Sequence, residues 1–237
     1  MMLKLFHAFS NATLNFVFPA ACLICRTHLN VEKTLVCDSC WRRLPLSSQT
    51  PFHLSSGLNT VATEIYALWE YAENVEMIIH EIKFFRKTRL GRRAGSELAA
   101  RLLQLPSFRK ADLVAPVPLH PTRYRERGYN QSQLIAEEIS KVLSIKLETK
   151  SLQRKRHTNA QAKLSAQERK KNVEDAFKVN DGRLEGRTVI IVDDVLTTGA
   201  TLMACANKIK KAGASEILCA TLAATPRQAG KKEQHRI

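Results

Sequence analysis

The segment from Val189 to Thr201 constrains the fold of this chain more than any other part of the sequence. It begins with the run Val-Ile-Ile-Val, which is typical of a strand buried on both faces of a parallel sheet. Two adjacent acids, Asp193 and Asp194, follow directly, and a Thr-Thr-Gly-Ala-Thr turn at residues 197–201 opens the next segment. The pattern predicts a strand that delivers two carboxylates to the carboxyl edge of a sheet, where α/β proteins bind ligands.

The rest of the chain alternates between strand patterns and helix patterns. Apolar runs of strand type lie at residues 61–71, 113–119, 189–192 and 217–222. Apolar residues at helical spacing mark residues 3–18, 73–85, 91–105, 131–143 and 201–212. Gly213 follows the last of these as a natural helix C′ residue. Such alternation is the signature of a parallel sheet with helices packed on it, so we expect an α/β domain.

The turn after the two acids has the chemistry of a phosphate site. Free backbone N–H groups, threonine hydroxyls and the positive end of the following helix converge on one anion. The residues involved are Thr197, Thr198, Gly199, Ala200 and Thr201. The carboxylates of Asp193 and Asp194 suit the hydroxyls of a sugar, and ribose 5-phosphate combines both features. A Walker B or phospho-acceptor strand also ends in acids, but the sequence contains neither a G-x-x-x-x-G-K-[ST] loop nor a G-x-G-x-x-G motif.

The six cysteines fall into two groups with different expected roles. Four of them form two C-x-x-C pairs separated by eleven residues, at Cys22, Cys25, Cys37 and Cys40. Four thiolates at this spacing favour a structural zinc ion with no position left for water, although two redox pairs or two disulfides remain as alternatives. Cys205 and Cys219 lie on apolar faces and are expected in the core. This usage of cysteine indicates a reducing cytoplasm.

The charge of the chain favours an anionic partner. Lys and Arg number 37 against 22 Asp and Glu, which gives a net charge of +15. Nucleic acid, phosphorylated metabolites or an anionic surface would suit this excess, and a diffuse solubility charge is the alternative. Residues 152–172 are the most basic stretch, with a single acid and no apolar period, and we expect a long functional loop there. No apolar run is long enough for a membrane span.

Several segments together resemble one known family. Residues 189–201 look like the phosphoribosyl pyrophosphate signature of the type I phosphoribosyltransferases. Four further features extend the match from about residue 19 to 225. They are the four-cysteine module, the sequence LVAPVPLH at residues 113–120, the R-x3-RGYNQ motif at residues 123–131 and the Ile-Lys-Phe sequence at 82–84. With these features the chain resembles the ComF family of competence-associated proteins.

The resemblance implies an architecture. It predicts an α/β type I phosphoribosyltransferase-like parallel sheet with helices on both faces, preceded by a small zinc-ribbon-like module. A Ser-, Pro- and Gly-rich stretch at 45–59 reads as a linker. The expected divisions are residues 1–50 for the N-terminal helix and cysteine module, 60–227 for the phosphoribosyltransferase-like domain and 228–237 for a basic tail.

The resemblance also implies site residues. The diphosphate of phosphoribosyl pyrophosphate would lie on a loop that contains Arg123, Arg127, Gly128 and Asn130. A flexible loop that closes over the ligand would contribute Arg154, Arg156, Gln161 and Arg169. Mg²⁺ would neutralise the diphosphate, while Asp193 and Asp194 would hold the ribose hydroxyls directly or through the metal. No general acid or base is assigned.

Two functions from different classes are compatible with these features. The first is a phosphoribosyl pyrophosphate-binding protein that serves DNA uptake and single-stranded DNA handling in natural competence, with a helicase as the partner that the family implies. The second is an active Mg²⁺-dependent phosphoribosyltransferase that acts on an unidentified nitrogenous acceptor without binding DNA. The acceptor pocket would be formed by residues 61–93. Aromatic residues are only 6% of the chain, so DNA contacts should be mainly with phosphates.

Overall fold

The computed structural model describes residues 21–29, 34–48, 60–155, 176–180 and 182–225. The helix expected at 3–18, most of the expected linker and the basic tail at 228–237 lie outside the described residues. In the part that is described, no helix has the length and apolarity needed to cross a membrane.

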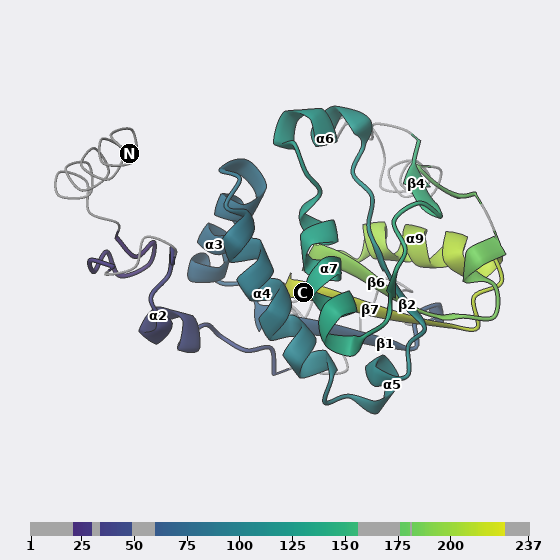
Figure 1. The fold of residues 1–237 in the computed structure, drawn as a ribbon, viewed down its shortest axis with the longest axis horizontal. Coiled ribbons are helices and arrows are strands. Elements are labelled where there is room, and N and C mark those ends of the chain that lie inside the picture. Colours follow the sequence, from purple (N-terminus) through teal and green to yellow (C-terminus); the bar gives the residue numbers. More distant parts are fainter. Residues whose placement is uncertain (1–20, 30–33, 49–59, 156–175, 181, 226–237) are drawn as a thin grey trace, which may run out of the picture.

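A five-stranded parallel sheet forms the centre of the molecule, in the order β1-β7-β6-β2-β3 (Figure 1). The strands are β1 Glu64–Glu70, β2 Leu113–Pro116, β3 Lys146–Leu147, β6 Thr188–Leu196 and β7 Glu216–Ala224. In β7 every residue except the first is buried, because both faces of the sheet are covered. The four strands expected from the sequence are therefore confirmed as β1, β2, β6 and β7.

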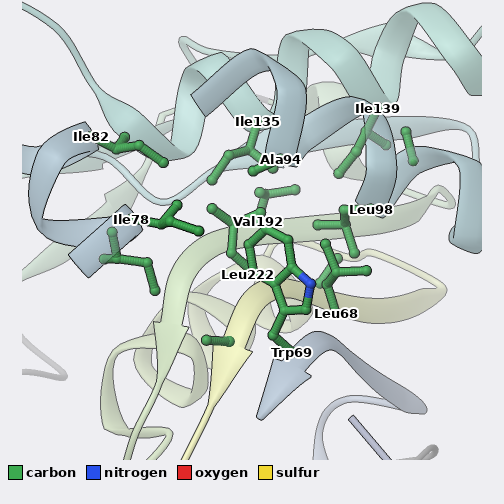
Figure 2. Close-up of a cluster of buried hydrophobic side chains, with 14 of the residues drawn as sticks. Leu68, Trp69, Ile78, Ile82, Ala94, Leu98, Ile135, Ile139, Val192 and Leu222 are labelled. Atoms are coloured by element: carbon green, nitrogen blue, oxygen red, sulfur yellow. The ribbon is translucent and has the colours of Figure 1, made fainter. Parts of the chain in front are cut away.

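Helices cover both faces of this sheet. They are α3 Glu73–Phe84, α4 Thr88–Leu102, α5 Pro106–Arg109, α6 Pro121–Arg127, α7 Gln131–Leu143 and α9 Ala200–Lys211, with a 3-10 helix, η2, at Gly182–Leu184. The side chains of Ile190 and Val192 join one hydrophobic cluster with α3, α4 and α7 (Figure 2). The alternate residues Val189 and Ile191 join a second cluster with α9. The prediction of helices on both faces is confirmed.

Cys205 and Cys219 belong to the second of these clusters, as the sequence predicted. Both are fully buried, and burial raises the pKa of Cys219 to about 12 and that of Cys205 well above its usual value. Neither thiol is therefore a ready nucleophile.

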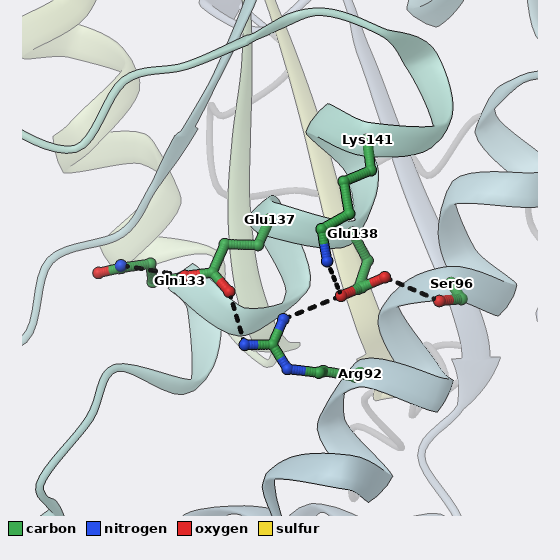
Figure 3. Close-up of polar contacts among 6 residues, drawn as sticks. All are labelled: Arg92, Ser96, Gln133, Glu137, Glu138 and Lys141. Carbon is green, nitrogen blue, oxygen red and sulfur yellow. Dashed lines mark hydrogen bonds and ion pairs between the residues drawn. The ribbon is translucent and has the colours of Figure 1, made fainter.

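A network of charged side chains ties α4 to α7 (Figure 3). The guanidinium of Arg92 lies 2.9 Å from carboxylate oxygens of both Glu137 and Glu138. Glu138 also accepts hydrogen bonds from Ser96 and Lys141, and these contacts lower its pKa although burial alone would raise it. The network fixes α7, whose first turn faces the carboxyl edge of the sheet.

Two elements differ from the sequence expectation. The segment expected as a diphosphate loop contains helix α6, which has Pro121 in its first turn. The helix is capped at its C-terminal end by Gly128, which has a left-handed conformation. The basic segment expected as a loop begins with strand β4, Leu152–Arg154, which pairs antiparallel with β5, Phe177–Val179. Burial of Leu152 explains why that end is ordered as a strand. Residues 156–175 lie outside the described part.

The cysteine module packs directly on the edge of the α/β domain. It contains the short helix α2, Asp38–Arg42, which the second cysteine pair opens. Trp41 meets Trp69 of β1 in an edge-to-face contact with ring centres 5.3 Å apart. Arg93 of α4 lies 4.2 Å from the centre of the Trp41 ring and donates a hydrogen bond to the carbonyl of Val36. One hydrophobic cluster therefore runs from the module into the sheet.

Candidate functional site

The two acids lie at the carboxyl end of β6, where side chains from three elements meet. Asp193 Oδ1 accepts hydrogen bonds from the Ser132 hydroxyl of α7 at 3.1 Å and from the backbone N–H of Asp194 at 2.9 Å. Asp194 Oδ1 forms an ion pair with Lys83 Nζ of α3 at 2.8 Å. The carboxylate pair predicted from the sequence is therefore held by residues far away in the chain.

The electrostatics of this pair favour a cation or a hydroxyl donor. Desolvation and the neighbouring charge of Asp194 raise the pKa of Asp193 to about 7, against the opposing effects of its hydrogen bonds and of Lys83. The other oxygen of Asp194, Oδ2, is buried and finds no hydrogen-bond partner among the described residues. A buried acceptor without a donor is costly, and a hydroxyl or a cation beside this oxygen would offset that cost.

The turn at residues 197–201 leads from the end of β6 into the start of α9. Gly199 precedes α9 with φ of 76°, which is a left-handed conformation that glycine adopts without strain. Thr197 and Thr198 are exposed beside it. Ala200 and Thr201 form the first turn of a twelve-residue helix. The backbone N–H of Ala200 donates to the Thr198 hydroxyl at 3.4 Å, and that of Met203 donates to the carbonyl of Gly199. The same strand-to-helix connection therefore presents both carboxylates and the N-terminal end of α9.

Electrostatic coupling links three of the predicted arginines to one another and two of them to the carboxylates. Burial lowers the pKa of Arg127, with a further contribution from Arg123, while the charge of Asp194 opposes the shift. Burial and Arg123 likewise lower the pKa of Arg154 on β4, and Asp193 opposes this. Arg123 and Arg127 of α6 and Arg154 of β4 are thus within electrostatic reach of one another, and Arg127 and Arg154 are within reach of the two carboxylates. Arg156, Gln161 and Arg169 of the predicted closing loop lie outside the described residues.

Gly128 and Asn130 shape the connection between α6 and α7. Gly128 has φ of 80°, and a Cβ there would lie 3.4 Å from the Arg86 guanidinium. Asn130 is buried, donates to the carbonyl of Val117 and accepts from the N–H of Ser132. In this structure Asn130 caps α7 and positions Ser132 against Asp193.

Three residues that the sequence left without a role also contribute to the site. Lys83 and Phe84 are part of the Ile-Lys-Phe sequence, whereas Ser132 carried no signal of its own. A pocket of about 360 Å³ is lined by Lys83, Phe84, Arg86, Arg123, Glu126 and Arg127. Arg127 lies 5.2 Å from the centre of the Phe84 ring. The pocket thus combines an aromatic surface with four cations beside the carboxylates.

The four cysteines of the module form a second candidate site. Their sulfur atoms all lie within 4.8 Å of one another, and none is in a disulfide. The sulfurs of Cys22 and Cys37 accept backbone N–H groups, and the hydroxyl of Thr27 lowers the pKa of Cys25 to about 6. Four thiolates with this spacing and geometry fit a tetrahedral zinc ion.

Comparison with known proteins identifies both parts of the chain. Residues 130–237 match the phosphoribosyl transferase domain and residues 13–54 match the double zinc ribbon domain. The prediction of a zinc-ribbon-like module before a phosphoribosyltransferase-like domain is thereby confirmed. A weaker likeness is to the crystal structure of a purine phosphoribosyltransferase from Pyrococcus horikoshii, with a TM-score of 0.35 and 24% identity over 56% of this chain and 70% of that one.

Two relatives match nearly the whole chain. Competence protein F of Haemophilus influenzae is 29% identical over 226 residues, which cover 86% of this chain and 96% of that protein. DNA utilization protein YhgH of Escherichia coli K12 is 32% identical over 219 residues, which cover 85% of this chain and 90% of that protein.

Proposed function

The chain belongs to the ComF family, together with competence protein F and DNA utilization protein YhgH, and from this premise we propose that it binds phosphoribosyl pyrophosphate and serves DNA uptake and single-stranded DNA handling. The names of both relatives and the net charge of +15 support the DNA role. The arrangement of four cysteines in two C-x-x-C pairs supports action in the cytoplasm, and a helicase partner is what the family implies.

One observation carries the ligand proposal. The buried Oδ2 of Asp194 has no partner in the described part of the chain, and the anion-binding turn at 197–201 begins three residues later. In the proposed complex the carboxylates bind the ribose hydroxyls, the turn binds the 5-phosphate and Arg123, Arg127 and Arg154 face the diphosphate.

A magnesium ion fits the donors that the site offers. Carboxylate oxygens are the ligands that Mg²⁺ prefers, and Asp194 already holds one cation, the ammonium of Lys83. When bound with the diphosphate, Mg²⁺ would neutralise the charge of that group. Asp193 and Asp194 would hold it, and Ser132 would keep the carboxylate of Asp193 in place.

Calorimetry of Mg²⁺-phosphoribosyl pyrophosphate binding tests this proposal. Asp194→Asn should weaken binding about tenfold or more, because a charged hydrogen bond contributes on the order of 1.5–3 kcal/mol. Glu97→Gln is the control, since the ion pair of Glu97 in the described structure is with Arg101, one turn further along α4 and outside the carboxylate site. Equal affinity in wild type and Asp194→Asn would overturn the proposed ligand site.

The alternative function is an active phosphoribosyltransferase that acts on an unidentified nitrogenous acceptor and does not bind DNA. The pocket beside Phe84 favours this alternative, because an acceptor ring could lie against the exposed aromatic face. In such a transfer the acceptor nitrogen bonds to the ribose, loses its proton, and diphosphate leaves with the bonding electrons. Diphosphate release from Mg²⁺-phosphoribosyl pyrophosphate that depends on an added base, in a protein that binds no single-stranded DNA, would establish it.

A further inference from the structure

A second pocket lies at the far end of α9 from the carboxylate site. Its volume is about 560 Å³, and we call it the lysine pocket, after four of its lining residues. It is lined by Lys155, Phe177, Lys178, Val179, Lys208, Lys211 and Ala212. At 1.5 Å per helical residue, Lys208 and Lys211 are about 12–17 Å along α9 from its first turn. None of the lining residues belongs to the carboxylate site.

The charge of the lysine pocket is of one sign. Among the described residues no acid lines it, and none of the four lysines takes part in an ion pair with another described residue. The helix dipole explains cations in the last turn of α9, but Lys155 and Lys178 come from the β4–β5 hairpin. Four lysines with no opposite charge in the described lining repel one another, and an anion in the pocket would offset that repulsion.

The hairpin also connects the lysine pocket to the carboxylate site. Arg154 is electrostatically coupled to Asp193 and Arg123 and lies over the Phe177 ring. The next residue, Lys155, lines the lysine pocket, and its backbone N–H bonds to the carbonyl of Ala176. Of these two successive basic residues, Arg154 is thus coupled to the carboxylate site and Lys155 lines the lysine pocket. A small phosphate compound could occupy only one of these sites, whereas a polymer with repeated phosphates could reach both.

We propose that the lysine pocket binds the phosphate backbone of a nucleic acid strand that also passes the carboxylate site. The inference rests on the proposed role in DNA handling and adds a contact surface to it. Phe177 is buried and offers no free face for stacking, so recognition is by charge and independent of base sequence.

Fluorescence anisotropy with a labelled twenty-nucleotide oligothymidylate at several salt concentrations tests the proposal. The double variant Lys178→Gln, Lys211→Gln removes two charges from the pocket. Each lost phosphate contact should make the plot of log affinity against log salt shallower by about 0.7, so the slope should fall by about 1.4 and the affinity should drop. The matched control is Arg109→Gln, Lys110→Gln, which removes two exposed charges beside α5 and should leave the slope unchanged.

The outcomes separate this inference from the proposed function. If wild type binds the oligonucleotide and the pocket variant shows the same slope, the lysine pocket is not a DNA contact, while the DNA role stands. If wild type binds no oligonucleotide, the DNA role fails, and the nucleic acid inference fails with it. Calorimetry of Mg²⁺-phosphoribosyl pyrophosphate should give equal affinities for wild type and both variants, and a loss specific to the pocket variant would show that the pocket belongs to the sugar-phosphate site.

Discussion

The balance of charge at Asp193 and Asp194 explains why a metal cation bound together with the ligand would suit this site. Two carboxylates share one ammonium, that of Lys83, and the side chain of Lys83 is only 22% exposed. Water therefore screens the remaining repulsion poorly. A divalent cation with a hydroxyl-rich ligand would supply the charge and the donors that the protein does not provide.

Another acidic residue, Glu148, fixes the start of the hairpin that carries Arg154. Its side chain is 3% exposed, and Oε1 accepts the backbone N–H groups of Lys150 and Ser151 at 2.9 and 3.1 Å. Arg183 lies 3.5 Å from Oε2. Burial alone would raise the pKa of Glu148, but the two backbone hydrogen bonds and the charge of Arg183 bring it below its usual value.

The shift at Glu148 predicts a pH-dependent effect on stability. A lowered pKa in the folded state means that ionised Glu148 stabilises the fold above about pH 4.5 and loses this contribution as pH falls through the folded pKa. Glu148→Gln should lower the free energy of unfolding by about 1–3 kcal/mol at neutral pH, and the difference from wild type should shrink in acid. Urea denaturation at about pH 7 and pH 3.5 measures it. A difference that is constant with pH would contradict the assignment, and Glu97→Gln should show almost no effect.

At the scale of elements, the strength of the local pattern decides what the sequence could predict. The β-branched run of β6 and the long helices α3, α7 and α9 were predictable because each repeats its apolar period several times. Helix α6 has no buried residue, so no apolar period marks it. Strands β4 and β5 have three residues each, and only their mutual pairing defines them.

The same reasoning applies to the candidate site. Asp193, Asp194 and the turn were predictable because they are contiguous and their chemistry is local. Ser132 was not, because its contact with Asp193 spans 61 residues and depends on how α7 docks on the sheet. Lys83 lay in a motif of the family, but its ion pair with Asp194 follows only from the packing of α3.

The backbone conformations of Gly199, before α9, and Gly91, within α4, predict opposite effects for the same substitution to alanine. Gly199→Ala should destabilise the protein by about 1–2 kcal/mol, because its φ of 76° is unfavourable for a residue with a Cβ, and it should weaken phosphoribosyl pyrophosphate binding. Gly91→Ala should be neutral or stabilise α4 by up to about 1 kcal/mol, since its Cβ would meet Ile82 at an ordinary 3.4 Å. Thermal unfolding and calorimetry measure both, and equal effects at the two positions would contradict this account of the turn.

At the scale of the whole molecule, the cysteine module and the α/β domain share one hydrophobic cluster through Trp41 and Trp69. A zinc ion that orders the module would therefore also stabilise the edge of the sheet, because binding free energy of a structural metal becomes folding free energy. The module is too small to bury much core of its own.

Metal analysis and thermal unfolding test this coupling. The wild type should contain about one equivalent of zinc, held by a single set of four thiolates. Cys37→Ser should lose most of the zinc and lower the melting temperature of the whole protein. Cys205→Ala removes a buried thiol of the other cluster and should keep the zinc. Full zinc content in Cys37→Ser, or an unchanged melting temperature, would show that the metal does not support the fold.

The arginines around the carboxylate site predict competition between the two proposed ligands. In the proposed complexes both a diphosphate and a DNA strand contact Arg123, Arg127 and Arg154, so saturation with Mg²⁺-phosphoribosyl pyrophosphate should weaken oligonucleotide binding. Thermodynamic linkage requires DNA to weaken phosphoribosyl pyrophosphate binding by the same factor. Anisotropy with and without the sugar phosphate, and calorimetry with and without DNA, measure the two factors independently.

The variant Lys178→Gln, Lys211→Gln should retain the competition, because the charges that it removes lie at the other end of α9. DNA affinity that is unchanged by the sugar phosphate would mean that the strand does not reach the arginines, and it would confine any DNA contact to the rest of the basic surface.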